Sequence, residues 1–170
     1  MSVFWVDSDV LIWSKDNAYR FDAPHSEAFW NTIKAAIQNE TIKMTKRNYE
    51  ELTEGRKGKK KPDDQLMKWL TLHYCPSICV PTTKEVTAFA KKIGEYCYSN
   101  PRFLLRWNIE FSNGADPWLI AHAAVSGGTV VTREAGVTGE AKRPKIPNLC
   151  KLYKVDCISM YDMLDRLAAK

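Results

Sequence analysis

The sequence predicts an α/β fold in which helices cover both faces of a mainly parallel sheet. Short apolar runs rich in β-branched and aromatic residues alternate along the chain with amphipathic stretches of helical length. Continuous apolar runs are typical of strands buried on both faces, and alternating strands and helices are typical of a parallel sheet. The chain of 170 residues is long enough to close one core. We therefore expect a single three-layer α/β/α domain over residues 1–170.

The N-terminal half supplies the first strands and helices of this pattern. Residues 3–12, "VFWVDSDVLI", form an apolar run that predicts a buried strand with Asp7 and Asp9 set into it. Ser26 stands where a helix N-cap is expected, before apolar residues at helical spacing, and Gly55 stands at a helix stop. We expect the other elements to be strands at 41–45 and 77–82 and helices at 46–55 and 63–74.

The C-terminal half continues the alternation. Residues 83–100 predict an amphipathic helix that the following "NPRF" breaks. Asp116 is expected to be the N-cap of another helix, because Pro117 suits the first helical position and Gly127 suits the stop. We expect the remaining elements to be strands at 129–134 and 156–160, a loop at 135–148, a helix-like turn at 149–155 and a closing helix at 161–170.

Composition and charge exclude several classes of protein. No stretch approaches the roughly 18 apolar residues of a membrane span, and no signal peptide is recognisable, so we expect a cytoplasmic protein. The five cysteines lack the spacing of a zinc site and are expected to be reduced thiols. The net charge is +5, and residues 55–62, "GRKGKKKP", concentrate five cations. This segment is either a solvated loop or a contact with a phosphate backbone.

Four acidic residues are expected at the carboxyl edge of the sheet, where open α/β folds bind ligands. Asp7 and Glu134 close two predicted strands, Asp116 starts a helix, and Glu51 lies on a helix that can face this edge. Converging carboxylates repel one another unless a cation lies between them. Ligation by oxygen alone favours Mg²⁺ or Mn²⁺ over zinc.

Each acid also has a simpler interpretation. Asp116 is satisfied by a role as a helix cap, and Glu134 by a place on a loop surface. Glu51 competes with Glu50 and Glu54, which lie within about one turn of the same helix. Asp7 is the hardest to explain without a ligand, because it interrupts an apolar strand. Its simpler interpretation is a buried, hydrogen-bonded carboxylate. The joint placement of the four acids, more than any single one, indicates a metal site.

The ordered motifs resemble the PIN-domain superfamily of metal-dependent ribonucleases. "VDSDVLI" at 6–12 is followed by "ADPWLIAHA" at 115–123, "VVTRE" at 130–134 and "PKIPNLC" at 144–150. The set is similar to a little-characterised bacterial branch of PIN-like proteins with ADPWLIA, VVT-x-E and KIP motifs, related to the VapC-like toxin nucleases. The resemblance spans nearly the whole chain and implies an α/β/α fold with a parallel sheet.

The resemblance also implies roles for individual residues. The first acidic ligand of the family falls on Asp7, the helix acid on Glu51, the third acid on Asp116 and the fourth on Glu134. Asp9 stands where the superfamily often has a neutral polar residue, and would orient Asp7 or a water on the metal, or add a ligand. Thr132, two residues before the last acid, would hold a metal water or the scissile phosphate.

The implied activity is hydrolysis of RNA phosphodiester bonds with Mg²⁺ or Mn²⁺ as cofactor. The cations expected to hold the RNA are Arg56, Lys57, Lys59, Lys60, Arg133 and Arg143. Proteins of this kind are often toxins, which implies a cognate antitoxin partner and a homodimer. The alternative is a PIN-like fold without catalysis that binds RNA or a partner protein; a phosphatase or DNase is less favoured by the short chain.

Overall fold

The computed structural model describes residues 3–54, 65–73, 78–138 and 141–169, and they contain one parallel sheet with strand order β3-β2-β1-β4-β5. The strands are β1 (Phe4–Val6), β2 (Ile42–Thr45), β3 (Cys79–Val80), β4 (Thr129–Val131) and β5 (Asp156–Ile158). The chain builds outward from β1 to β2 and β3, and then returns to β4 on the other side of β1. The gap between the carboxyl ends of β1 and β4 is therefore the topological switch point of the sheet.

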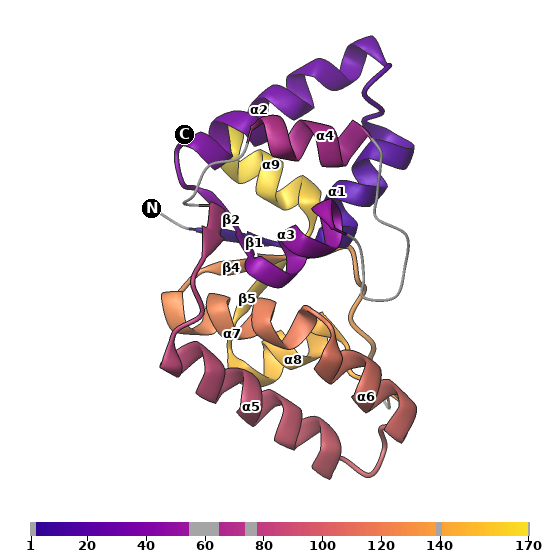
Figure 1. The fold of residues 1–170 in the computed structure, drawn as a ribbon. Coiled ribbons are helices and arrows are strands. Elements are labelled where there is room, and N and C mark those ends of the chain that lie inside the picture. The colour runs from indigo at the N-terminus through magenta and orange to yellow at the C-terminus, as the bar shows by residue number, and fades with distance from the viewer. Residues whose placement is uncertain (1–2, 55–64, 74–77, 139–140, 170) are drawn as a thin grey trace.

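Helices cover both faces of the sheet (Figure 1). The helical elements are α1 (Ser8–Trp13), the π-helical turn η1 (Ser14–Ala18), the 3-10 turn η2 (Pro24–Ser26), α2 (Glu27–Gln38), α3 (Lys46–Thr53), α4 (Gln65–Leu72), α5 (Lys84–Ser99), α6 (Leu105–Asn113), α7 (Asp116–Ser126), α8 (Ile146–Tyr153) and α9 (Met160–Ala168). Helices α1, α2, α4 and α9 enclose one core, and α5, α6, α7 and α8 enclose the other. The α/β prediction, with a parallel sheet and helices on both faces, is confirmed.

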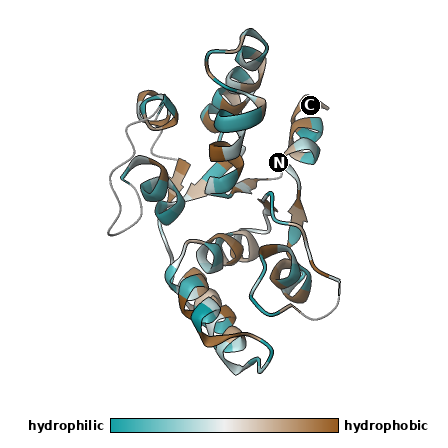
Figure 2. Cartoon of the chain, turned by 90° about the vertical axis from the view of Figure 1, so that its right-hand side faces the viewer, coloured by the Kyte–Doolittle hydropathy of each residue, from teal (hydrophilic) through white to brown (hydrophobic). Residues whose placement is uncertain are grey.

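The alternation of side chains along β1 joins the two cores. Phe4 and Val6 are fully buried in the first core, whereas Trp5 points into the second. Successive residues of a strand face opposite sides of the sheet, so a strand with both faces covered must be apolar throughout. Figure 2 shows the corresponding pattern on the helices, which carry both hydrophobic and hydrophilic residues. Among the described residues, no helix is long and apolar enough to cross a membrane.

Most predicted elements are present, but the first strand is much shorter than predicted. The run 3–12 leaves the sheet after Val6 and continues as α1 from Ser8. Val10, Leu11 and Ser14 are buried, and their spacing belongs to one side of a helix. A short apolar run fits both a buried strand and a buried helix. Asp7 nevertheless ends the strand, as expected.

Smaller differences concern the ends of helices and strands, and one helix that was not predicted. The N-cap position of α7 is Ala115, so Asp116 is the first helical residue and not the cap. Ser26 occupies the N-cap position of α2, but its side chain makes no capping bond. Strand β4 ends at Val131, and α8 begins at Ile146 inside the predicted loop. Helix α6 was not predicted, and Gly55 lies outside the described residues.

We predict opposite effects of alanine at two glycines. A Cβ at Gly128, just before β4, would lie 2.7 Å from Trp5 Cδ1 and 2.9 Å from the Val3 carbonyl oxygen. The Trp5 ring cannot move freely, because its Nε1 donates a hydrogen bond to Ser126 Oγ at 2.9 Å. Gly128→Ala should therefore lower the free energy of unfolding by about 1–3 kcal/mol in denaturant titrations.

Gly94→Ala is the matched control. A Cβ at Gly94, within α5, meets nothing within 4 Å. Alanine should therefore raise the free energy of unfolding by about 0.5–1 kcal/mol, because glycine is a poor helix former. Equal stability of the two variants would show that the approach of Gly128 to Trp5 is not tight.

Candidate functional site

Asp7 lies at the switch point between β1 and β4. Its backbone N–H donates to the Val131 carbonyl at 3.0 Å, which continues the pairing of the two strands. The residue is only 7% exposed, and its Oδ2 accepts a hydrogen bond from Thr132 Oγ1 at 3.0 Å. The backbone of Asp7 is extended, at the N-cap position of α1. The hydrogen bond from Thr132 therefore fixes the carboxylate from the end of the neighbouring strand.

The surroundings of Asp7 make its negative charge costly. Burial is the main cause, and it raises the pKa of the carboxyl from 3.8 to about 6. The hydrogen bonds from Thr132 and from the backbone of Asp9 oppose this rise, whereas the negative charges of Asp9 and Glu134 add to it. No cation in the described part of the chain forms an ion pair with Asp7.

Glu51 is tied by a short polar network to Ser8, the residue after Asp7. Its Oε2 accepts a hydrogen bond from the hydroxyl of Ser8, at 3.2 Å, and Ser8 directly follows Asp7. Asn48 Nδ2 donates to Ser8 Oγ at 2.9 Å, and Asn48 Oδ1 accepts from Thr45 Oγ1 at 2.6 Å. Thr45 is the last residue of β2. The network therefore connects the end of β2 with Ser8, the second residue after β1.

Sequence reasoning missed three members of this network, although one of them had a local sign. Thr45, Ser8 and Asn48 are all buried. Thr45 caps α3 by accepting the backbone N–H of Asn48 at 3.1 Å, and a threonine before a helical stretch is a recognisable capping position. The contact with Ser8 brings together residues 40 positions apart, which no local pattern indicates.

The structure separates Glu51 from its two competitors. Glu50 forms an ion pair with Lys46 on the same helix, at 3.5 Å. Glu54 is exposed and occupies the C-cap position of α3. Of the three acids, Glu51 is the one that accepts a hydrogen bond from Ser8, the residue next to Asp7.

Asp116 starts α7 at the same edge of the sheet. Arg47, near the start of α3, lies 4.7 Å above the ring of Trp118 and donates to the Asn113 carbonyl at 3.4 Å. Asn113 and Trp118 lie on either side of Asp116 in the sequence, and Asp116 is partly buried. The starts of α3 and α7 are therefore neighbours, and three of the four predicted acids come from elements that meet at the carboxyl ends of β1 and β2.

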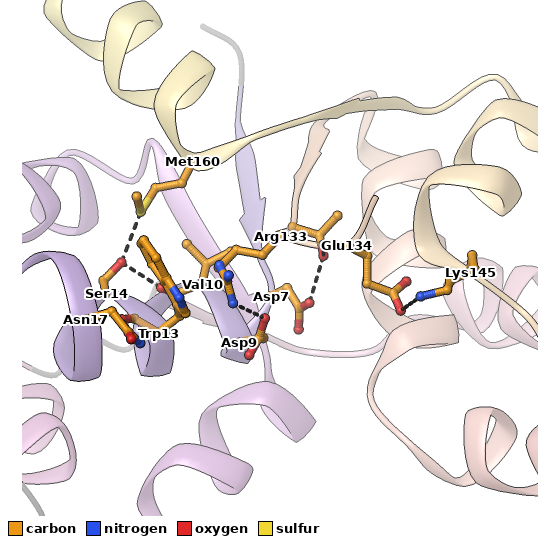
Figure 3. A network of polar contacts seen from close by, with 11 residues as sticks. Asp7, Asp9, Val10, Trp13, Ser14, Asn17, Arg133, Glu134, Lys145 and Met160 are labelled. Atoms are coloured by element: carbon orange, nitrogen blue, oxygen red, sulfur yellow. Dashed lines mark hydrogen bonds and ion pairs between the residues drawn. The ribbon is translucent and has the colours of Figure 1, made fainter. Parts of the chain in front are cut away.

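Glu134 has a different role in the structure. Its Oε1 accepts from Lys145 Nζ at 3.1 Å and its Oε2 accepts from the backbone N–H of Ile146 at 2.8 Å. Ile146 is the first residue of α8, so the carboxylate satisfies a free N–H and places negative charge at the helix N-terminus. In Figure 3 the side chain extends toward Lys145 and away from Asp7. Glu134 is therefore not simply a loop-surface residue, because its carboxylate binds Lys145 and the start of α8.

Asp9 and Thr132 differ in their relation to Asp7. Thr132 is buried, donates to Asp7 and accepts the backbone N–H of Glu134 at 3.1 Å, so it positions the carboxylate directly. The Asp9 side chain is 57% exposed and forms an ion pair with Arg133 at 3.2 Å. Arg133 in turn lies 4.2 Å above the ring of Trp13 (Figure 3).

Arginine lies against tryptophan at three places in the described structure. Besides the Arg47–Trp118 and Arg133–Trp13 pairs, Arg106 and Arg143 lie 4.8 and 5.6 Å from the centre of the Trp107 ring. The other predicted RNA contacts, Arg56, Lys57, Lys59 and Lys60, lie outside the described residues. His122 is buried, and its ring centre lies 4.7 Å from that of Trp5.

The described acids do not form a ready-made metal cluster. No group of three or more His, Cys, Asp or Glu side chains in this part of the chain is arranged to hold a metal ion. Asp7, Glu51 and Asp116 still supply the oxygen chemistry that Mg²⁺ prefers. Glu134 is engaged by α8. The chemistry of these three side chains therefore suits Mg²⁺, whereas their arrangement in this structure does not form a site for it.

We predict that Asp7→Asn stabilises the metal-free protein. The folded-state pKa of about 6 exceeds the ordinary 3.8, so ionisation of Asp7 lowers the free energy of unfolding. This loss of stability is fully present above about pH 6. At about pH 8 the variant should gain roughly 1–3 kcal/mol in free energy of unfolding, measured in EDTA. The gain should shrink as the pH falls from about 6 toward 4, where the wild-type carboxyl is protonated in the folded state.

Asp9→Asn is the control for this experiment, because Asp9 is exposed and its ion pair lies on the surface. Its free energy of unfolding should change by less than about 0.5 kcal/mol. A loss of stability in Asp7→Asn at high pH would contradict the cost assigned to the buried charge.

We also predict that Glu134→Ala lowers the free energy of unfolding by about 1–2 kcal/mol, because the first N–H of α8 and Lys145 lose their acceptor. Glu134→Gln keeps an acceptor for Ile146 and should lose less. Glu110→Ala, at an exposed position on α6, is the control and should stay within about 0.5 kcal/mol. Identical denaturation curves for wild type and Glu134→Ala would contradict this role of Glu134.

Comparison with known proteins places the chain in a family without an assigned activity. Neither the curated proteins nor the solved structures gave a match. One family model, described as "Domain of unknown function (DUF4411)", matches residues 4–170 and so includes the whole sheet and the edge that carries Asp7. The chain therefore belongs to the DUF4411 family.

Proposed function

We propose that this protein is a PIN-like, Mg²⁺- or Mn²⁺-dependent endoribonuclease that hydrolyses RNA phosphodiester bonds. The observation that carries the proposal is the position of Asp7, a buried carboxylate at the switch point of a parallel sheet. The next residue, Ser8, donates a hydrogen bond to Glu51. Ligands of open α/β sheets bind at this edge. The order of the sequence motifs supports the same assignment.

Asp7, Glu51 and Asp116 are the residues that would hold the cation, and Glu134 would join them only by leaving α8. A bound divalent cation supplies charge neutralisation at the phosphate and lowers the pKa of a water. The remaining residues prepare the site. Thr132 fixes the Asp7 carboxylate from β4, and the Thr45–Asn48–Ser8 network fixes Glu51 from β2. Such preorganisation removes reorganisation from the reaction itself.

Exposed cations around this edge suit a polyanionic substrate. Arg47 lies beside the start of α7, and Arg133 lies beside Asp9. Both guanidinium groups rest on tryptophan rings, at 4.7 and 4.2 Å from the ring centres, so their positions are restricted before RNA arrives. An arginine held in this way loses less conformational entropy when it binds a phosphate.

The second candidate function is a PIN-like module that binds RNA or a partner protein without cleaving. One observation favours it: in the described residues, no three acids are arranged to hold a metal ion. The engagement of Glu134 by α8 points in the same direction. This candidate shares the RNA-binding surface with the first and differs only in the lack of hydrolysis.

The biological setting extends the proposal. From the resemblance of the motifs we propose a role as the toxin of a toxin–antitoxin system, with a cognate antitoxin and a homodimeric assembly. The cytoplasmic location is proposed from the sequence composition. The organisation of residues 1–170 as one domain stays a prediction of the same kind. Growth arrest on induced expression, relieved by Asp7→Asn, is the observation that would support the toxin role.

We predict that the purified protein cleaves RNA with Mg²⁺ or Mn²⁺ and that the acids differ in importance. Asp7→Asn and Asp116→Asn should each lower the cleavage rate by about 100-fold or more, because charge stabilisation of several kcal/mol is lost. Glu51→Gln should also lower the rate, whereas Glu50→Gln, the matched control on the same helix, should stay within about twofold. Cleavage of labelled single-stranded and structured RNA, followed on gels, gives these rates.

The outcomes separate the candidates. Equal cleavage by all variants would indicate a contaminating nuclease and overturn the assignment of the acids. Saturable RNA binding without cleavage in either metal would favour the binding module. The stability of Asp7→Asn, which should exceed that of wild type in EDTA, excludes misfolding as the reason for lost cleavage.

A further inference from the structure

A pocket of about 430 Å³ opens beside Asp7, at the carboxyl ends of β4 and β5. Thr132 lines it and also donates the hydrogen bond to Asp7, so one residue borders both the pocket and the candidate metal site. The pocket also contains Arg133 from the same edge and Ser159 at the start of α9. Its volume lies in the range of about 300–1,000 Å³ that is typical of small-molecule sites.

The lining combines flat aromatic and apolar surfaces with a few polar groups. Trp13 and Tyr161 contribute aromatic side chains, and Ile158 and Met160 contribute apolar ones. Met160 is buried, and its Sδ lies 3.0 Å from Ser14 Oγ (Figure 3). Aromatic side chains that flank an apolar surface are the common means of binding nucleic-acid bases outside a duplex.

The charged residues that line this pocket are Arg133 and Glu134. The Glu134 carboxylate is engaged by Lys145 and the start of α8, whereas Arg133 offers a positive group. Its guanidinium lies 4.2 Å from the centre of the Trp13 ring and 3.2 Å from Asp9 Oδ2. The Asp9 side chain is 57% exposed, so this ion pair is weak and exchanges easily for a phosphate. A phosphate beside Arg133 would lie between the pocket and the edge that carries Asp7.

We propose that this pocket receives one unpaired base of a single-stranded RNA, with the phosphate of the same nucleotide at Arg133. This proposal rests on the proposed ribonuclease function, and names a base-binding subsite for its substrate. A base enters such a pocket only after it has left its stack, so the substrate is single-stranded at this nucleotide. The pocket is lined by residues on the β4–β5 side, away from the Glu51 network on the β2 side.

The experiment measures nucleotide binding without metal, so that it does not depend on cleavage. Equilibrium dialysis in EDTA with each of the four ribonucleoside 5′-monophosphates gives the affinity of wild type. At least one nucleotide should bind saturably, and Tyr161→Ala should weaken it by about tenfold or more, as expected for a lost stacking contact. Tyr161→Phe retains the ring and should bind like wild type.

The control is Tyr98→Ala on α5. Tyr98 is 53% exposed and Tyr161 is 56% exposed, so both variants lose a surface tyrosine, but only Tyr161 lines the pocket. Nucleotide affinity should be unchanged in Tyr98→Ala. Circular dichroism and thermal unfolding of all variants confirm that the affinities compare folded proteins.

A free nucleotide has the same base and phosphate as a nucleotide within RNA, and competition separates the two. A short single-stranded oligoribonucleotide should displace the bound monophosphate, whereas a duplex of the same sequence should not. Failure of the oligoribonucleotide to compete would identify a site for free nucleotides and overturn the inference. Absence of saturable binding, or equal binding by wild type and Tyr161→Ala, would also overturn it.

The proposed function and this subsite fail in different ways. If no variant or wild-type protein cleaves RNA but Tyr161-dependent nucleotide binding persists, the catalytic proposal falls and the base pocket stands. If RNA is cleaved in an Asp7-dependent manner but no nucleotide binds, the base pocket falls alone. When both hold, Tyr161→Ala should weaken the base preference at the cleavage position by about tenfold while Asp7→Asn retains nucleotide binding.

Discussion

The hydrogen bond from Thr132 to Asp7 joins the two strands on which the rest of the candidate site depends. It lies at the switch point between β1 and β4, where the strand order reverses, and it fixes a carboxylate that is almost fully buried. Burial raises the pKa of this carboxyl to about 6, so the fold carries an electrostatic cost at neutral pH. Groups with a strongly shifted pKa cluster at functional sites, and this supports the central place of Asp7 in the proposed function.

The edge of the sheet divides into two sides around Asp7. On the β2 side, Thr45, Asn48 and Ser8 orient Glu51, and the start of α7 brings Asp116 nearby. On the β4–β5 side lie the pocket and Arg133. In our proposal the first side holds the cation and the second side holds a base, so chemistry and substrate selection use different strands of one sheet.

Sequence patterns predicted best where one side of a helix is continuously apolar. Helices α2 and α5 were expected because their buried residues recur at helical spacing. Helix α6 was missed because Asn108 and Phe111 are its buried residues, whereas Leu105 and Ile109 are exposed. Its environment is set by α5 and α7, and hydropathy alone does not show it. The strand predicted at 3–12 failed after Val6 because a short apolar run fits both a strand and a helix.

The sequence by itself determined the parallel α/β architecture and the placement of Asp7 at the end of the first strand, because these follow from local periodicity and from the edge at which parallel strands bind ligands. The tertiary structure decided the partners of each acid. It tied Glu51 to Ser8, exposed Asp9 to Arg133 and turned Glu134 to the start of α8. These contacts join residues far apart in the chain or depend on how a helix packs. Local periodicity sets the face on which a side chain lies, but its partner across the fold is decided by packing, which no local pattern encodes.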